Sequence, residues 1–112
     1  MEVDFQFQKY GTTMKNVHVA AITNVNAVAT IPAVPGEFHA IVSVHWSFAG
    51  APTAGMLTIT FGGVIVYEVH IGATGPGAIN FHKPFQNGVM NTEVVVTLTG
   101  GSPVKRLNVQ YL

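Results

Sequence analysis

The stretch Glu37–Phe48, with the sequence EFHAIVSVHWSF, shows the clearest alternation of residue types in the chain and decides the fold class. Successive side chains of a β-strand point to opposite faces, so an alternation of this length predicts a half-buried strand. The face predicted to point into the core carries Phe38, Ala40, Val42, Val44, Trp46 and Phe48. The face predicted to point outward carries His39, Ile41, Ser43, His45 and Ser47.

Shorter alternating segments flank this strand, and turn residues separate them from one another. We predict strands at residues 16–23, 27–31, 57–61, 64–71, 78–82, 93–99 and 104–112. Gly62-Gly63 predicts a two-residue hairpin turn, whereas Gly72–Gly77 predicts a loop and Lys83–Thr92 an irregular segment. After the hairpin, the predicted core side carries Ile65, Tyr67, Val69 and Ile71.

These segments predict an all-β fold, because none of them combines helical periodicity with a cap and sufficient length. About eight short strands at regular spacing are typical of a sandwich or a barrel. Eight antiparallel strands in so short a chain favour a single antiparallel β-sandwich that is jelly-roll-like. An immunoglobulin-like sandwich is the alternative.

The first residues of the chain stand apart from this sandwich. Val3, Phe5 and Phe7 alternate with polar residues, and Gly11-Thr12-Thr13 separates them from the remainder. We therefore predict an N-terminal segment over residues 1–14 and a β-sandwich domain over residues 15–112. The segment is either an extra strand of the same sheet or an extended arm that adds to a neighbouring subunit.

Composition points to a surface that is either covered by partner chains or hydrated by Thr, Ser, Asn and backbone groups. Charged residues make up 9% of the 112 residues, against a usual share of roughly 25%, and the net charge is zero. The five cations form no basic stripe, so we expect no nucleic-acid partner. The chain has no cysteine, no signal peptide is expected, and no apolar run is long enough to predict a membrane span.

The residue types that carry catalysis are thinly spread. No local pair of carboxylates suggests hydrolysis, and no Gly-x-Ser-x-Gly or phosphate-binding loop occurs. His39 and His45 lie six residues apart on one strand, too far to chelate one ion. Glu68 and His70 form the one suggestive pair, which a small β-barrel enzyme could use. We predict that the chain is not an enzyme and expect neither a metal nor another cofactor.

The segment from Ala27 to Leu112 contains an ordered series of short motifs. In order, they are the lead-in Ile31–Phe38, the small-residue loop Ala49–Thr53, the strand Thr58–Gly62, the glycine-rich loop Gly72–Gly77, the strand Val94–Thr99 and the final strand Val109–Tyr111. In this order they resemble the short β-rich domain of small structural proteins of tailed bacteriophage virions. The resemblance implies a capsid decoration or cement protein, often trimeric, on the capsid surface of a virion produced in the host cytoplasm.

The leading hypothesis is therefore a non-enzymatic virion structural protein that oligomerises, with a trimer favoured, and binds the major capsid protein or another virion protein. A carbohydrate- or receptor-binding sandwich of a fibre or tail is the alternative. Neither hypothesis involves nucleic acid or a membrane. The residues predicted to contact a partner are Val3, Phe5, Phe7 and Tyr10 in the N-terminal segment, and Ala51, Pro52, Thr53, Thr74, Gly75 and Pro76 in two loops.

Overall fold

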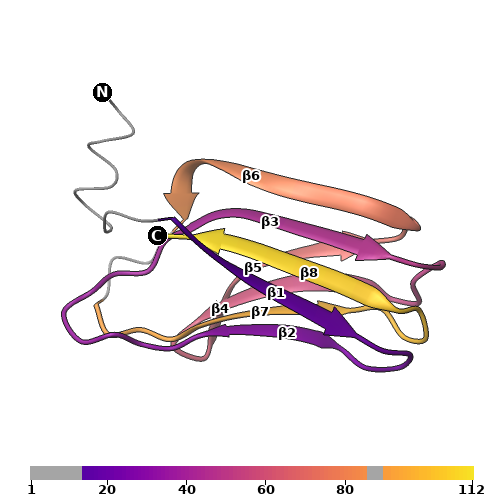
Figure 1. Cartoon of the computed structure of the whole chain (residues 1–112), viewed down its shortest axis with the longest axis horizontal. Coiled ribbons are helices and arrows are strands. Elements are labelled where there is room, and N and C mark those ends of the chain that lie inside the picture. Colours follow the sequence, from indigo (N-terminus) through magenta and orange to yellow (C-terminus); the bar gives the residue numbers. More distant parts are fainter. Residues whose placement is uncertain (1–13, 86–89) are drawn as a thin grey trace.

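The computed structural model describes residues 14–85 and 90–112, and these form eight β-strands (Figure 1). The strands are β1 Lys15–Ala21, β2 Ala27–Ile31, β3 Ile41–Phe48, β4 Gly55–Phe61, β5 Val64–Ile71, β6 Gly75–Phe85, β7 Val94–Thr99 and β8 Lys105–Tyr111. The described residues include no helix that is long and apolar enough to cross a membrane.

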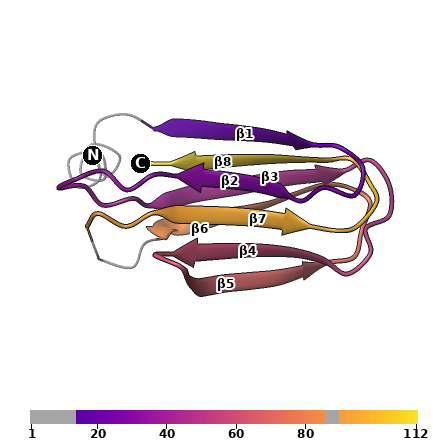
Figure 2. The same ribbon diagram turned by 90° about the horizontal axis from the view of Figure 1, so that it is seen from below.

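The strands form two four-stranded sheets that lie face to face (Figure 2). Sheet A has the order β1-β8-β3-β6 and sheet B the order β2-β7-β4-β5, and all paired neighbours are antiparallel. The chain crosses repeatedly between the sheets, so strands that are adjacent in space are mostly distant in sequence. This interleaved order is that of a jelly roll, which confirms the predicted fold and excludes the immunoglobulin-like alternative.

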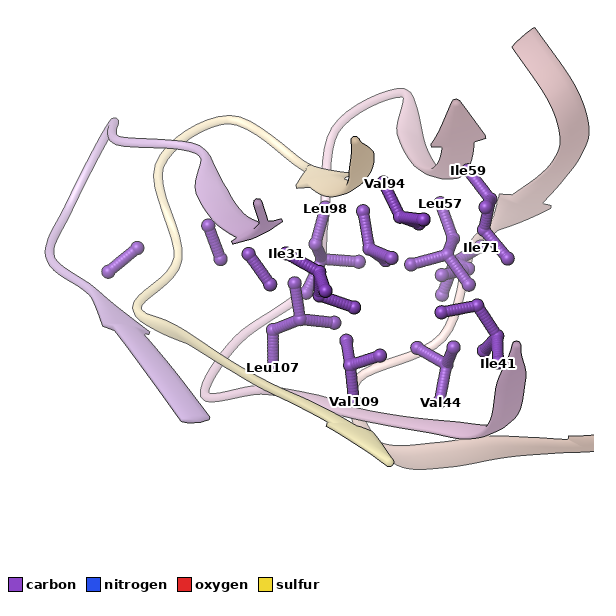
Figure 3. Close-up of a cluster of buried hydrophobic side chains, with 14 of the residues drawn as sticks. Ile31, Ile41, Val44, Leu57, Ile59, Ile71, Val94, Leu98, Leu107 and Val109 are labelled. Atoms are coloured by element: carbon purple, nitrogen blue, oxygen red, sulfur yellow. The ribbon is translucent and has the colours of Figure 1, made fainter. Parts of the chain in front are cut away.

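The core consists of the inward side chains of both sheets (Figure 3). Leu107, Val109 and Val44 of sheet A face Leu98 and Leu57 of sheet B, and all five are fully buried. Each of these positions follows the period of two along its strand. Burial of apolar surface on this scale is the main term that stabilises the sandwich.

One edge of the sandwich is filled by aromatic rings. Tyr67 of β5 lies edge-on to Phe81 of β6, with ring centroids 5.7 Å apart. Phe81 stacks on Phe85 at 5.1 Å, and Phe85 contacts Phe61 of β4 edge-on at 5.9 Å. The rings therefore bridge the edge strands of the two sheets, where β5 and β6 are not paired with each other.

The strand predicted to begin at Glu37 begins at Ile41. In the first half of the predicted strand Ala40 is buried as expected, whereas His39 and Ile41 are buried against the prediction. Pairing with β6 and with β8 shifts between Ile41 and Ser43, which marks a β-bulge. A bulge adds one residue and reverses the alternation, so Ile41 lies inward opposite Tyr111. Ser43 lies opposite Gln110 on the outer face, as predicted, and is buried there. His39, predicted to point outward, is also buried, and its Nε2 lies 2.8 Å from the carbonyl oxygen of Pro32.

Beyond the bulge the predicted faces hold. Val44 and Phe48 are buried, His45 is exposed, and Trp46 is half-buried against the core. The single tryptophan therefore lies on the inner face of sheet A, as its position in the alternation predicted.

Two further predictions need correction. Ile65 is 54% exposed, because pairing of β4 with β5 shifts between Ile59 and Thr60 and turns Ile65 outward opposite Thr60. The predicted loop Gly72–Gly77 ends early, since Gly75, Pro76 and Gly77 pair with β3 and open β6. Strand β6 also continues to Phe85, into the segment predicted to be irregular.

Candidate functional site

Four loops meet at one end of the sandwich, at the right of Figure 1, and we call this the loop end. They join β1 to β2, β3 to β4, β5 to β6 and β7 to β8 over residues 22–26, 49–54, 72–74 and 100–104. None of these loop residues is Asp, Glu, Lys or Arg. The loop end is therefore a neutral surface, built from small, hydroxylic, amide and apolar residues.

The loop end brings together two of the predicted contact segments. Phe48, before the β3–β4 loop, pairs with Gly75, and Gly55, after it, pairs with Ile71. The β3–β4 and β5–β6 loops thus start and end on paired strands and lie side by side. Of the predicted contact residues, these two loops contain Ala51, Pro52, Thr53 and Thr74, and Gly75 and Pro76 open β6 directly after the second loop.

Lys105 fixes the base of the loop end. Its side chain is fully buried at the first position of β8, with a relative exposure of 0%. The ammonium nitrogen donates to the carbonyl oxygens of Val25 and Gly101 at 2.9 Å and of Pro103 at 3.0 Å. Three donors meet three acceptors, so the buried charge is fully hydrogen-bonded and ties the β1–β2 loop to the β7–β8 turn.

Close backbone packing fixes the β3–β4 loop as well. The amide of Thr53 donates to the carbonyl of Gly100 at 2.9 Å, and the amide of Ala49 donates to that of Val104 at 2.9 Å. A Cβ on Gly100 would collide with the ring of Phe48, so only glycine fits under this loop. These contacts give the loops a defined shape before any partner binds, which lowers the entropy cost of binding.

The loop end also exposes apolar and hydroxyl groups. Ile22 is 73% exposed and Val25 is 45% exposed, and both flank the Lys105 cage on the β1–β2 loop. Thr53 and Thr74 add exposed hydroxyl groups. The four loops contain no ionisable side chain, so the groups that they expose are apolar or neutral hydrogen-bonding groups.

The other predicted contact residues cannot be compared with this surface. Val3, Phe5, Phe7 and Tyr10 lie outside the described residues, as does nearly all of the predicted 1–14 segment. Strand β1, which follows them, begins at the end of the sandwich opposite the loop end (Figure 1).

Glu68 and His70, the suggestive pair, are both exposed on the outer face of sheet B. Within residues 14–85 and 90–112, no group of three or more His, Asp or Glu side chains is arranged to hold a metal ion. The pair therefore has no third metal ligand in that part of the chain.

Sequence reasoning missed Lys105, although a signal for it was present. Lys105 has the same position in the alternation as Leu107, Val109 and Tyr111, so the period of two places it inward. A lysine on the inner face of a strand indicates a buried, partnered ammonium. The identity of its partners depends on loop conformation, which the period cannot supply.

No family model and no curated protein matches this sequence. Solved structures do share its fold. A protein of the Bacillus endospore appendages, described as a family of disulfide-linked pili, aligns with a TM-score of 0.56 at 10% identity over 88% of this chain and 84% of its own. The insecticidal delta-endotoxin Cry8Ea1 from Bacillus thuringiensis aligns with a TM-score of 0.50 at 12% identity, over 85% of this chain but only 19% of the toxin.

A carbohydrate-binding module, CBM36 in complex with calcium and xylotriose, aligns with a TM-score of 0.47 at 20% identity over 90% of this chain and 87% of its own. At these identities the likeness concerns the fold alone. The pilus protein shares the fold across nearly the whole of both chains.

Proposed function

We propose that this chain is a non-enzymatic structural protein that oligomerises and decorates a capsid, binding the major capsid protein or another protein of the virion surface. The observation that carries the proposal is the loop end, which is neutral, carries exposed Ile22 and Val25, and is held in one shape by Lys105. A rigid neutral surface is adapted to a protein partner of matching shape.

The fold and the composition support the same proposal. A pilus-forming protein has a similar sandwich, so this fold is compatible with repeated assembly. A charged share of only 9% leaves few groups to hydrate the surface, which favours coverage by neighbouring proteins. Several weak contacts in a symmetric assembly reinforce one another through effective concentration.

The test uses capsids that lack this chain and a matched pair of alanine-to-lysine variants. Ala51 is exposed at the loop end, and Ala78 is exposed on the outer face of sheet A. We expect the wild-type chain and Ala78→Lys to co-sediment with the capsids and raise their heat resistance. We expect Ala51→Lys to bind at least about tenfold more weakly, because a lysine must lose its hydration in a neutral contact. Failure of the wild-type chain to bind would refute the proposal.

A carbohydrate-binding role is the second candidate, and the outer face of sheet A favours it. His18 of β1, Asn108 of β8 and His45 of β3 are direct neighbours in one row across this face. In the next row Ser43 donates to Gln110 at 2.8 Å. Imidazole and amide groups in rows fit a ligand rich in hydroxyl groups, although Trp46 points inward and supplies no stacking platform.

Glycan-array binding separates the two candidates. A carbohydrate-binding protein would bind glycans in a saturable way. The two lysine variants would then have the opposite effects on binding from those expected with capsids. Ala78→Lys, next to His45, would then weaken binding and Ala51→Lys would not. The capsid proposal predicts no saturable glycan binding by either variant or by the wild-type chain.

A further inference from the structure

The outer face of sheet B differs in kind from that of sheet A. The outward side chains of β2, β7 and β4, together with Ile65 of β5, form what we call the threonine–valine face. They are Val28, Thr30, Met56, Thr58, Thr60, Ile65, Val95, Thr97 and Thr99, and Glu68 and His70 of the edge strand β5 lie outward beside them. The strand register sets them in rows across all four strands. One row runs Thr30, Val95, Thr60 and Ile65, and the next runs Val28, Thr97, Thr58 and then Glu68 at the edge.

Threonine hydroxyls on this face are partly used within the sheet. The hydroxyl of Thr60 donates to the carbonyl of Val95 at 3.3 Å, and that of Thr99 donates to the carbonyl of Met56 at 3.4 Å. Each bond crosses to a neighbouring strand, so the donor hydrogen of each hydroxyl is already engaged. The face consequently offers water fewer free donors than its five threonines suggest.

The charges of the molecule avoid this face. Strands β2, β7 and β4 contain no Asp, Glu, Lys or Arg, and Glu68 lies on the edge strand β5. Sheet A instead turns Arg106, Asn108 and His45 outward. The three strands β2, β7 and β4 of sheet B thus present an uncharged outer surface, and Glu68 and His70 are confined to the edge strand β5. An exposed surface of this kind marks an interaction site.

We propose that the threonine–valine face binds the same face of a second copy of this chain. The proposal deepens the proposed function, since it rests on an assembly-forming protein and names its oligomer contact. A charged partner would leave its own charges unpaired here, whereas an identical neutral face does not. Glu68 stays hydrated in the pair because it lies at the rim.

The size of the face sets the strength of the pair. Four strands about 4.8 Å apart and about 20 Å long give roughly 400 Å² per copy, or roughly 800 Å² for two stacked copies. Specific interfaces bury about 1,200–2,000 Å² in total, so this contact alone is weak and depends on concentration. Such a pair forms readily where copies are crowded on one particle.

The symmetry of the pair is also fixed. A face that binds itself forms an isologous contact with two-fold symmetry, whereas a trimer requires two different complementary patches. The face therefore predicts pairs, in place of the trimer that the resemblance to decoration proteins implies.

Two lysine variants at matched positions test the contact. Thr97 lies midway along β7 in the centre of sheet B, and Asn108 lies midway along β8 in the centre of sheet A; both side chains are half-buried. As the protein concentration rises from about 10 µM to about 1 mM, sedimentation should show that the wild-type chain and Asn108→Lys change from single copies to pairs. Thr97→Lys should raise the dissociation constant at least about tenfold while keeping the far-UV circular dichroism and Tm of the wild-type chain.

Cross-linking gives a second measurement that does not depend on a charged substitution. The chain has no cysteine, so Thr97→Cys or Thr58→Cys introduces a single thiol on adjacent central strands. Stacked sheets lie about 10 Å apart, so a bismaleimide of that span should link two copies through either thiol and not through Asn108→Cys. Cross-links from Asn108→Cys alone would overturn the proposal.

The remaining outcomes also decide it. A chain that stays single up to about 1 mM, or associates as three copies, contradicts the proposed pair. If the bound capsid covers Thr97 and the chain is a single copy in solution, the face is assigned to the capsid protein. That result would overturn the pair and leave the capsid-binding function intact. If the wild-type chain forms two copies in solution but does not bind capsids, the pair stands and the capsid-binding function is overturned.

Discussion

Lys105 is the only charged side chain that is buried among residues 14–85 and 90–112. Its ammonium has no carboxylate partner there and relies on three carbonyl groups. Replacement by methionine keeps the apolar stem and removes the donor, so three buried acceptors lose their partner. We expect Lys105→Met to lower the free energy of unfolding by about 2–4 kcal/mol in urea titrations.

Its neighbour supplies the control. Arg106 is exposed on the opposite face of the same strand, so Arg106→Met should change the free energy of unfolding by less than about 0.5 kcal/mol. Equal effects of the two substitutions would show that the carbonyl cage contributes nothing specific.

Gly77 gives a second test at the scale of single residues. A Cβ on Gly77 would lie 2.5 Å from ring atoms of Trp46, the single tryptophan of the chain. Gly77→Ala should therefore displace the ring, shift its fluorescence maximum and cost about 1–3 kcal/mol. Gly72→Ala meets nothing within 4 Å and should leave fluorescence and stability unchanged, so a shift in both variants would refute the contact.

At this scale the sequence predicts inward and outward sides but not exceptions to them. Val44, Trp46 and Phe48 follow the period of two, and the period also marks Lys105 as inward. Ile41 and Ile65 do not follow it, because each lies next to a shift in strand pairing. Such shifts depend on the register between two paired strands. The alternation of residue types within one strand carries no information about that register.

At the scale of elements, the β4–β5 hairpin is the best-determined turn. Gly62 and Gly63 have φ values of 61° and 83°, and a two-residue turn with both φ positive is of type I′. Asparagine tolerates this conformation at the first position and valine does not. Thermal unfolding should show Gly62→Asn close to the wild-type chain and Gly62→Val destabilised by about 1–2 kcal/mol. A stable Gly62→Val variant would contradict the turn type.

The positions of the strands were predictable because turn residues lie close to both ends of most of them. β2 and β5 have the predicted limits, whereas β6 begins earlier and ends later than predicted. Glycine and proline in Gly75-Pro76-Gly77 are typical of loops, but pairing with β3 holds them in a strand. Tertiary pairing therefore overrides local preference at this edge.

At the scale of the whole molecule, the jelly roll separates three surfaces. The loop end is neutral and held by the Lys105 hydrogen bonds, the outer face of sheet A carries amides and imidazoles, and the threonine–valine face carries threonine and apolar side chains. Sequence patterns predicted the sandwich and two of the loops at the loop end. They could not predict that these loops meet, since only the strand order brings β3–β4 beside β5–β6.

The copy number of this chain on a capsid tests the central claim most directly. Capsids that lack the chain would be saturated with the purified protein, and the bound copies counted and located by cryo-electron microscopy. A decoration protein predicts saturation at a fixed number of copies per capsid subunit, at symmetric sites, with the loop end against the capsid. Binding that never saturates, copies at irregular sites, or a loop end turned to solvent would contradict it.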